Sequence, residues 1–358
     1  MASKKNHQLD ERKKKILKAV TDDYILSAEP VGSRTVAKRY ELGLSSATIR
    51  NEMADLEESG YLEQPHASAG RVPSDLGYRY YVDALMSMRQ LSPVDIDLIY
   101  SQMDLHQQEL EILIHKTAKI LGQITKYPSI VLAPQIQTAL FRHIQLVKLA
   151  PKTILLLIVT DTGYVENKII DFEGEISSEE LDHLSIILNK KLRGISLKDL
   201  NTIVLNELHS EMVLHDHFYN ESIKVLIKAM TNKTNERVFV DGATKILEQP
   251  EFNDIQKFKT LMNLLEEEER LYKLLANNSK QTAQVKIGHE NNDEEIHDCS
   301  VVTSSYEIAG RTVGVIGILG PTRMEYARIL PIVEYTAAVL SELLTQISKR
   351  GHGRIDSS

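Results

Sequence analysis

The segment from Pro30 to Pro73 constrains the fold of this chain most, because short helical patterns alternate there with turn residues. Residues 33–40 fit one short helix, and Gly43 stands where a tight turn can follow it. A second helical pattern ends at Gly60, and residues 61–73 fit a strand and a basic, glycine-containing hairpin. This order of two helices, a strand and a hairpin predicts a winged helix-turn-helix near the N-terminus.

The second helix of this segment has an apolar side and a polar side. Ile49, Met53 and Leu56 recur at the i, i+4, i+7 spacing of a buried stripe. The other faces carry small and polar residues, namely Ala47, Thr48, Arg50, Asn51 and Ala54. Arginine pairs with guanine, asparagine pairs with adenine, and a small apolar group contacts the thymine methyl. The pattern therefore predicts that this helix reads duplex DNA in the major groove.

We predict a DNA-contacting surface built from both helices and the hairpin. Its expected members are Arg34, Lys38, Arg39, Ser46, Ala47, Thr48, Arg50, Asn51, His66 and Arg71. We also expect the lysine-rich stretch from Met1 to Lys18 to lie along phosphates, with a solvated tail as the alternative. The alternative is a helical scaffold that contacts only protein, since helix-turn-helix shapes also occur in proteins that do not bind DNA.

Charge is unevenly distributed along the chain. The whole sequence has a net charge of −8, whereas Met1–Arg89 contains 14 basic and 13 acidic residues and is therefore +1. The rest of the chain contributes −9. We therefore expect a focused basic surface with salt-dependent DNA binding, and not indiscriminate coating of nucleic acid.

Several classes of site lack their sequence signature. Cys299 is the single cysteine, so the sequence predicts no intrachain disulfide and no thiolate-rich zinc site. The glycines between Gly310 and Gly320 do not form a dinucleotide-binding motif, and we expect no cofactor. The H-x-H pattern of His215 and His217, with His209 nearby, is a weak metal signal because no clear third ligand accompanies it.

The sequence carries no signal for a membrane or for secretion. The longest apolar run, Ile154 to Val159, is far shorter than the ~20 residues that cross a bilayer. A charged and then apolar leader is also missing from the N-terminus. We expect a cytoplasmic protein with no membrane partner.

The remaining residues predict a multidomain α+β chain. Apolar and alternating runs within 141–171 predict an antiparallel meander, and strand patterns return only from 284 onward, with mostly helical patterns between. Thr322-x-x-Glu325 is expected to cap a final helix that runs to about Ser348. A sheet domain interrupted by a mostly helical insertion is therefore expected. The expected boundaries are 1–90 for the winged helix-turn-helix, 91–194 and 277–358 for the two parts of the sheet domain, and 195–276 for the insertion.

Three separated motifs resemble those of one family of repressors. They are SSATIRNEMADLEESGYLEQPHASAGRVPSDLGYRYYVD from Ser45, DGATKILEQPEF from Asp241 and GPTRMEYARILPIVEYTA from Gly320. Their order and content, over nearly the whole chain, are similar to those of the heat-inducible transcription repressor HrcA family. The resemblance implies that the sheet domain is GAF-like and that the insertion is a dimerising domain.

The resemblance also implies a function. Members of this family repress the class I heat-shock operons, grpE-dnaK-dnaJ and groES-groEL, by binding the CIRCE inverted repeat as a homodimer, and the GroEL/GroES chaperonin modulates their activity. A symmetric dimer suits an inverted repeat because each subunit reads one half-site. Seven apolar residues of the expected insertion are candidates for the dimer interface: Leu226, Ile227, Phe239, Phe252, Phe258, Leu261 and Leu265. The alternative is that they form an ordinary hydrophobic core.

Two other classes of function are alternatives to a repressor of this family. A metabolite-sensing regulator is the second hypothesis, because GAF-like folds commonly hold small molecules, but the sequence identifies no ligand. An enzyme is the third, and the sequence argues against it, since it contains no nucleophile elbow, no P-loop and no H-E-x-x-H motif.

Overall fold

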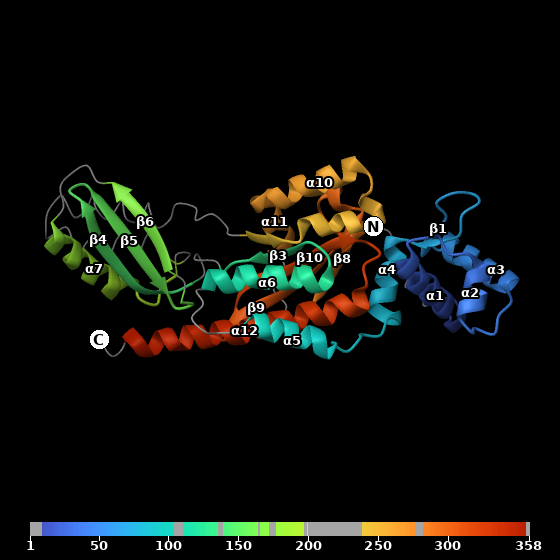
Figure 1. Cartoon of the computed structure of the whole chain (residues 1–358), viewed down its shortest axis with the longest axis horizontal. Helices are drawn as coiled ribbons and strands as arrows, with labels where there is room; N and C mark the ends of the chain where they lie inside the picture. The colour runs from blue at the N-terminus through green and yellow to red at the C-terminus, as the bar shows by residue number, and fades with distance from the viewer. Residues whose placement is uncertain are drawn as a thin grey trace.

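The structure is a computed structural model of the chain. It describes residues 9–103, 110–134, 139–163, 165–171, 177–196, 199, 238–276 and 282–355. Figure 1 shows three parts: an N-terminal helical module with a small hairpin, a central five-stranded sheet with helices around it, and a three-stranded sheet with its own helix. The strands pair antiparallel in each sheet, so the described chain is a mixed α/β protein with antiparallel sheets.

The N-terminal module contains three helices and a short hairpin. Its elements are α1 (Glu11–Ser27), α2 (Ser33–Arg39), α3 (Ser46–Glu58), β1 (Leu62–Glu63) and β2 (Val72–Pro73). Asp10 and Ser45 cap α1 and α3, each by accepting the backbone N–H three residues ahead. The core of the module contains Ile16, Leu17, Val20, Val36, Ile49, Met53 and Leu56. The predicted apolar stripe of the second helix is therefore confirmed.

Gly60 ends helix α3. Gly60 has φ +81°, a left-handed conformation that a residue with a Cβ adopts only with strain. The N–H groups of Gly60 and Tyr61 donate to carbonyls of Glu57 and Leu56, which closes the helix. The chain then turns directly into β1, as the sequence predicts.

A helical linker leads from this module to the central sheet. Its first part is α4 (Asp75–Tyr80), which continues into a π-helical segment, η1 (Tyr81–Leu85). After a short extended stretch come α5 (Pro93–Gln102) and α6 (Leu110–Thr125). Ser92 caps α5 by accepting the N–H of Asp95.

The central sheet has the strand order β7-β3-β10-β9-β8. Its strands are β3 (Ser129–Leu132), β7 (Val238–Asp241), β8 (Gln284–Ile287), β9 (Cys299–Ile308) and β10 (Arg311–Pro321). The accompanying helices are α10 (Ile255–Glu266), α11 (Glu268–Leu275) and α12 (Tyr326–Ile355), with short 3-10 segments at Ala243–Glu248, Pro250–Phe252, Gly288–Glu290 and Glu294–Ile296.

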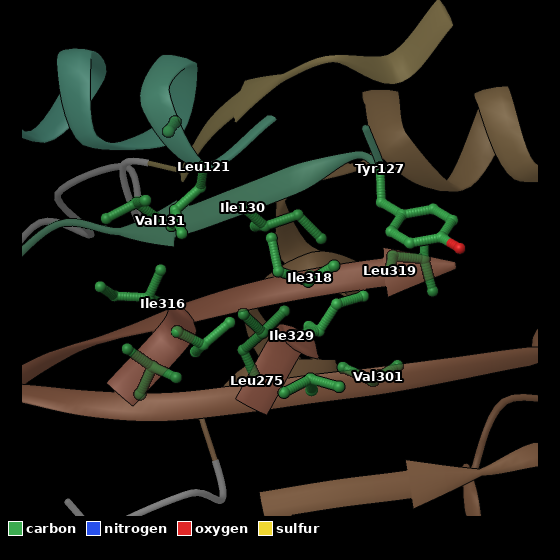
Figure 2. Packing of buried hydrophobic residues seen from close by; sticks show 14 of the residues in the cluster. Leu121, Tyr127, Ile130, Val131, Leu275, Val301, Ile316, Ile318, Leu319 and Ile329 are labelled. Atoms are coloured by element: carbon green, nitrogen blue, oxygen red, sulfur yellow. The ribbon is translucent and has the colours of Figure 1, made fainter. Parts of the chain in front are cut away.

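Helices cover both faces of the central sheet. Ser129 of β3 donates its hydroxyl to the Ala118 carbonyl of α6, which fixes α6 against one face. On the other face Gly317 of β10 approaches Leu275 of α11 so closely that a Cβ would lie 2.3 Å from the leucine side chain. Figure 2 shows the apolar packing between these layers, with Val131 and Ile316 among the buried residues. Burial raises the pKa of the Cys299 thiol in this core to about 12.

A second, separate sheet has the order β4-β5-β6. Its strands are β4 (Phe141–Ala150), β5 (Thr153–Thr160) and β6 (Val165–Asp171), and α7 (Ser178–Leu192) packs on β4. Ser177 and Glu180 form a capping box at the start of α7. The meander and this helix start are therefore where the sequence predicts them.

The two sheets are arranged differently from the expectation. The sequence predicts that the meander belongs to the interrupted sheet domain and that residues 195–276 form the insertion. In the structure β7 pairs with β3 and completes the central sheet, and α11, also within 195–276, covers one of its faces. The chain thus leaves the central sheet after β3 and returns at β7. Alternation of apolar residues specifies a strand but does not specify its partner, which explains the difference.

Five of the seven candidate dimer residues belong to the central core. Phe252, Leu261 and Leu265 are buried in it, and Phe239 and Phe258 pack against it. The alternative of an ordinary core is correct for these five residues. Leu226 and Ile227 lie outside the described residues.

The final helix differs from its prediction at both ends. α12 begins at Tyr326, one residue after the expected capping box, and extends to Ile355. It also contains Pro331.

Candidate nucleic-acid interface

α3 exposes the face that the sequence predicts to read DNA. Ser46, Ala47, Arg50 and Asn51 are exposed. Thr48 is half-buried, and its hydroxyl lies 2.9 Å from the Oγ of Ser45, the residue that caps the helix. Thr48 therefore takes part in the helix cap, whereas the other four side chains face solvent.

The acidic side chains of α3 near this face are paired with cations of α1. Glu52 lies 3.2 Å from the Arg12 guanidinium, and Asp55 lies 3.0 Å from the Lys13 ammonium. The hydrogen bond to Asp55 raises the pKa of Lys13. Arg12 and Lys13 therefore bind carboxylates of α3, which differs from the expectation that the whole basic stretch lies along phosphates. Residues 1–8 lie outside the described part of the chain.

The hairpin is fastened to the helices through Arg71. Its Nε donates to the Glu57 carboxylate of α3 at 2.8 Å. Its backbone forms two hydrogen bonds of 2.9 Å with Val31, which precedes α2. Gly70 makes this approach possible, because a Cβ there would lie 2.5 Å from the carbonyl carbon and oxygen of Val31. Arg71 thus sets the position of the hairpin, a role that the sequence reading did not identify.

The loop of the hairpin is ordered by one side chain. The amide nitrogen of Gln64 donates to the carbonyls of Ala67 and Ala69, both at 3.0 Å. His66 is exposed beside them. The loop therefore presents His66 to solvent on a defined turn.

The cations of α2 divide into paired and unpaired groups. Arg39 forms an ion pair with the buried Asp23 of α1. Arg34 and Lys38 are exposed and, like Arg50 of α3, have no hydrogen bond or ion pair with any other described residue. The structure thus leaves these three cations available, and Figure 1 shows α2 and α3 at the end of the molecule opposite the C-terminus.

The module is joined to the central sheet by an apolar contact. Ile25, Tyr78 and Tyr81 of the module and its linker are buried in the central core cluster. The rings of Tyr78 and Tyr326 pack edge to face at a centroid distance of 6.2 Å.

Charged groups surround this apolar contact. Arg323 forms an ion pair with Glu251 and donates to Gln249 at 2.9 Å and to the Ile25 carbonyl at 3.3 Å. Arg79 of α4 forms an ion pair with Glu290 beside β8. We call this set of contacts the module joint, and it fixes α1 and α4 on the central domain.

A cavity of about 430 Å³ lies next to the module joint. Apolar side chains from the linker, α11 and β9 line it, including Val82, Leu274 and Val301. Arg79 and Glu290 also line it, and their side chains form an ion pair with each other. Nothing in the lining specifies a ligand, so the metabolite-sensing hypothesis gains no support from this cavity.

The described residues contain neither a metal-binding cluster nor a membrane-spanning helix. Within them, no group of three or more His, Cys, Asp or Glu side chains is placed to hold a metal ion. His209, His215 and His217 lie outside that part of the chain. No helix in the described ranges is long and apolar enough to cross a bilayer.

Comparisons with known proteins agree with this architecture. Residues 111–330 match the family model described as the HrcA protein C terminal domain. A heat-inducible transcription repressor HrcA of Pelotomaculum thermopropionicum is 42% identical over 97% of this chain and 100% of its own length. The same-named protein of Brevibacillus brevis is 44% identical over 94% of this chain and 98% of its own.

A solved structure described as a hypothetical protein shares the fold. Its TM-score is 0.60 at 21% sequence identity, and the match covers 95% of this chain and 100% of that one. The relatives define the class of protein, a transcription repressor. The chain belongs to the HrcA family of heat-inducible transcription repressors.

We expect Gly70→Ala to displace the hairpin. The added methyl group would overlap the Val31 backbone, so the free energy of unfolding should fall by about 1–3 kcal/mol. Thermal melting followed by circular dichroism measures the effect as a lower midpoint. Ser68→Ala, on the exposed part of the same loop, is the control and should melt like the wild type. Equal midpoints for both variants would contradict the tight contact.

Proposed function

We propose that the N-terminal module is a winged helix-turn-helix that represses transcription by binding duplex DNA. In this proposal α3 enters the major groove and the hairpin lies against the backbone. The observation that carries it is the exposed face of α3, where Arg50 and Asn51 are unpaired. The neighbouring carboxylates Glu52 and Asp55 are turned toward α1 and neutralised there.

The unpaired cations of α2 suit a second role. Arg34 and Lys38 lie on the helix that precedes α3, where a helix-turn-helix crosses the DNA backbone. We propose that they contact phosphates, and that His66 does so from the hairpin. Arg39 and Arg71 are held in ion pairs with Asp23 and Glu57, so we propose that they orient the module and contact DNA less.

We propose that the three-stranded sheet forms the homodimer. One face of this sheet buries Leu146, Leu156 and other residues beneath α7. The opposite face carries a cross-strand apolar row of Val147, Leu155 and Ile169, and the Ile169 side chain is 69% exposed. A second copy of the same face would remove this apolar surface from water, and a two-fold dimer matches a two-fold operator.

By family membership, we further propose the operator and the regulation. The operator is the CIRCE inverted repeat, the regulated genes are the grpE-dnaK-dnaJ and groES-groEL operons, and the GroEL/GroES chaperonin keeps the repressor active. Repression is steric and needs no catalysis, cofactor or membrane, and it takes place in the cytoplasm. We propose that the central domain is GAF-like, and that heat releases the genes when the active dimer is lost.

The reading face is tested by Arg50→Ala and Asn51→Ala. Each should weaken operator binding by about 1–3 kcal/mol, because a base contact is lost. Fluorescence anisotropy with the operator and with a scrambled duplex measures the difference. Lys152→Ala removes an exposed cation from the β4–β5 turn and should change neither affinity. If neither α3 variant loses affinity for the operator, DNA is bound elsewhere on the molecule.

The dimer face is tested by Ile169→Glu. A charge at the most exposed end of the apolar row should dissociate the dimer, because burying it unpaired is costly. Light scattering should then report a monomer mass. Ile186→Glu is a matched control, since Ile186 is 65% exposed on α7 and away from the sheet. A wild-type chain that is already monomeric, or an Ile169→Glu variant that stays dimeric, would refute this face.

The chaperonin proposal is tested with purified components. After mild heating, chaperonin should raise the fraction of repressor that shifts the operator in a gel, because it refolds molecules that have lost the active dimer. Bovine serum albumin at the same mass concentration controls for nonspecific protection. Identical shifts with both additions, at several temperatures, would remove the chaperonin from the mechanism.

A further inference from the structure

Pro331 creates an unusual acceptor in the first part of α12. Proline has no N–H, so the helical bond from residue 331 to the carbonyl of Ala327 cannot form, and the proline ring crowds that carbonyl. The Ala327 oxygen is therefore left for a donor from outside the helix. A carbonyl that points away from its own helix is a docking point for another part of the chain.

The linker supplies that donor. The backbone N–H of Arg89 donates to the Ala327 carbonyl at 2.9 Å. Within residues 87–91, no other backbone hydrogen bond is formed with the described chain. The Arg89 guanidinium also reaches the Glu325 carboxylate at 3.4 Å, but this side chain is 62% exposed and such a pair contributes little.

The other end of α12 reaches the three-stranded sheet. Ser348 donates its hydroxyl to the Asp161 carbonyl at 2.7 Å, and Asp161 lies in the turn after β5. Figure 1 shows α12 running beneath the central sheet between these two contacts. One rigid helix thus connects the point where the linker docks with the sheet that we propose to dimerise.

We propose that Pro331 is a positioning residue for DNA recognition. By freeing the Ala327 carbonyl it anchors the linker at Arg89, and the anchored linker adds to the module joint in setting the distance and rotation between α3 and the dimer face. Those quantities decide which spacing of two half-sites a dimer can bind. This inference rests on the proposed function, because it concerns how the same DNA-binding surface is placed.

Three variants separate the anchor from its surroundings. Pro331→Ala restores an N–H that can bond to the Ala327 carbonyl within α12 and removes the ring that crowds this carbonyl. The oxygen should then turn back toward the helix axis, which weakens its bond with the linker N–H. Arg89→Pro removes the linker N–H itself. Arg89→Ala keeps the N–H and removes only the guanidinium, and is the matched control. Removing a proline from a helix interior favours the helix, so Pro331→Ala should melt at or above the wild-type temperature.

The binding experiment varies the spacing between half-sites. Wild type should show a sharp optimum on inverted repeats, and Arg89→Ala should reproduce it. Pro331→Ala and Arg89→Pro should lose about three- to tenfold affinity at the optimum and less at other spacings, because the module joint alone holds the module less tightly than the joint and the anchor together. Affinity for a single half-site should stay at the wild-type value. Wild-type spacing profiles for both anchor variants, or an equal loss in Arg89→Ala, would overturn the inference.

A second measurement does not depend on DNA. Hydrogen exchange of the backbone N–H of residue 89 should be slow in wild type and in Arg89→Ala, and clearly faster in Pro331→Ala. Equal exchange in wild type and Pro331→Ala would overturn the anchor even if the operator is bound as proposed. A different outcome would contradict the proposed function but support the anchor. In that case wild type does not bind the inverted repeat, yet residue 89 exchanges faster in Pro331→Ala than in wild type.

Discussion

The module joint is the contact on which the rest of the arrangement depends. Burial of Ile25 and Tyr78 in the central core joins the N-terminal module to the central domain through a shared apolar cluster. Arg323, with its side chain only 11% exposed, adds a geometry that apolar contacts alone would not fix, since it bonds to Glu251 and to the Ile25 carbonyl. The proposed reading of half of an inverted repeat needs such a fixed attachment, because in this proposal the other half is read by a second subunit at a set distance.

Internal ion pairing explains how an acidic chain can expose a basic surface. α3 carries several carboxylates, yet Glu52, Asp55 and Glu57 are bound by cations from α1 and from the hairpin. These pairs remove both partners from the reading face. Arg34 and Arg50 remain exposed and unpaired within the described residues, so the net charge of −8 of the whole chain does not describe this surface.

The path of the chain places the N-terminal module at one end of the molecule and the three-stranded sheet at the opposite end. β3 and β7 are neighbours in the central sheet, and the three-stranded sheet lies between them in sequence. Its apolar row, with Val147 and Ile169 exposed, contrasts with Phe252 and Leu261, which are buried in the central core. α12 spans the space between the two ends, from the module joint to Asp161.

Local sequence determined the helices of the N-terminal module, the stripe of Ile49 and Met53, the exposed Arg50 and Asn51, and the family. These features depend on periodicity, caps and glycines a few residues apart, which can be read along the chain. Only the tertiary structure decided that the meander forms its own sheet, that Arg71 binds Glu57, and that the three family motifs converge on the module joint. Those outcomes depend on pairing between distant segments, where many partners are compatible with the same local pattern and packing selects one of them.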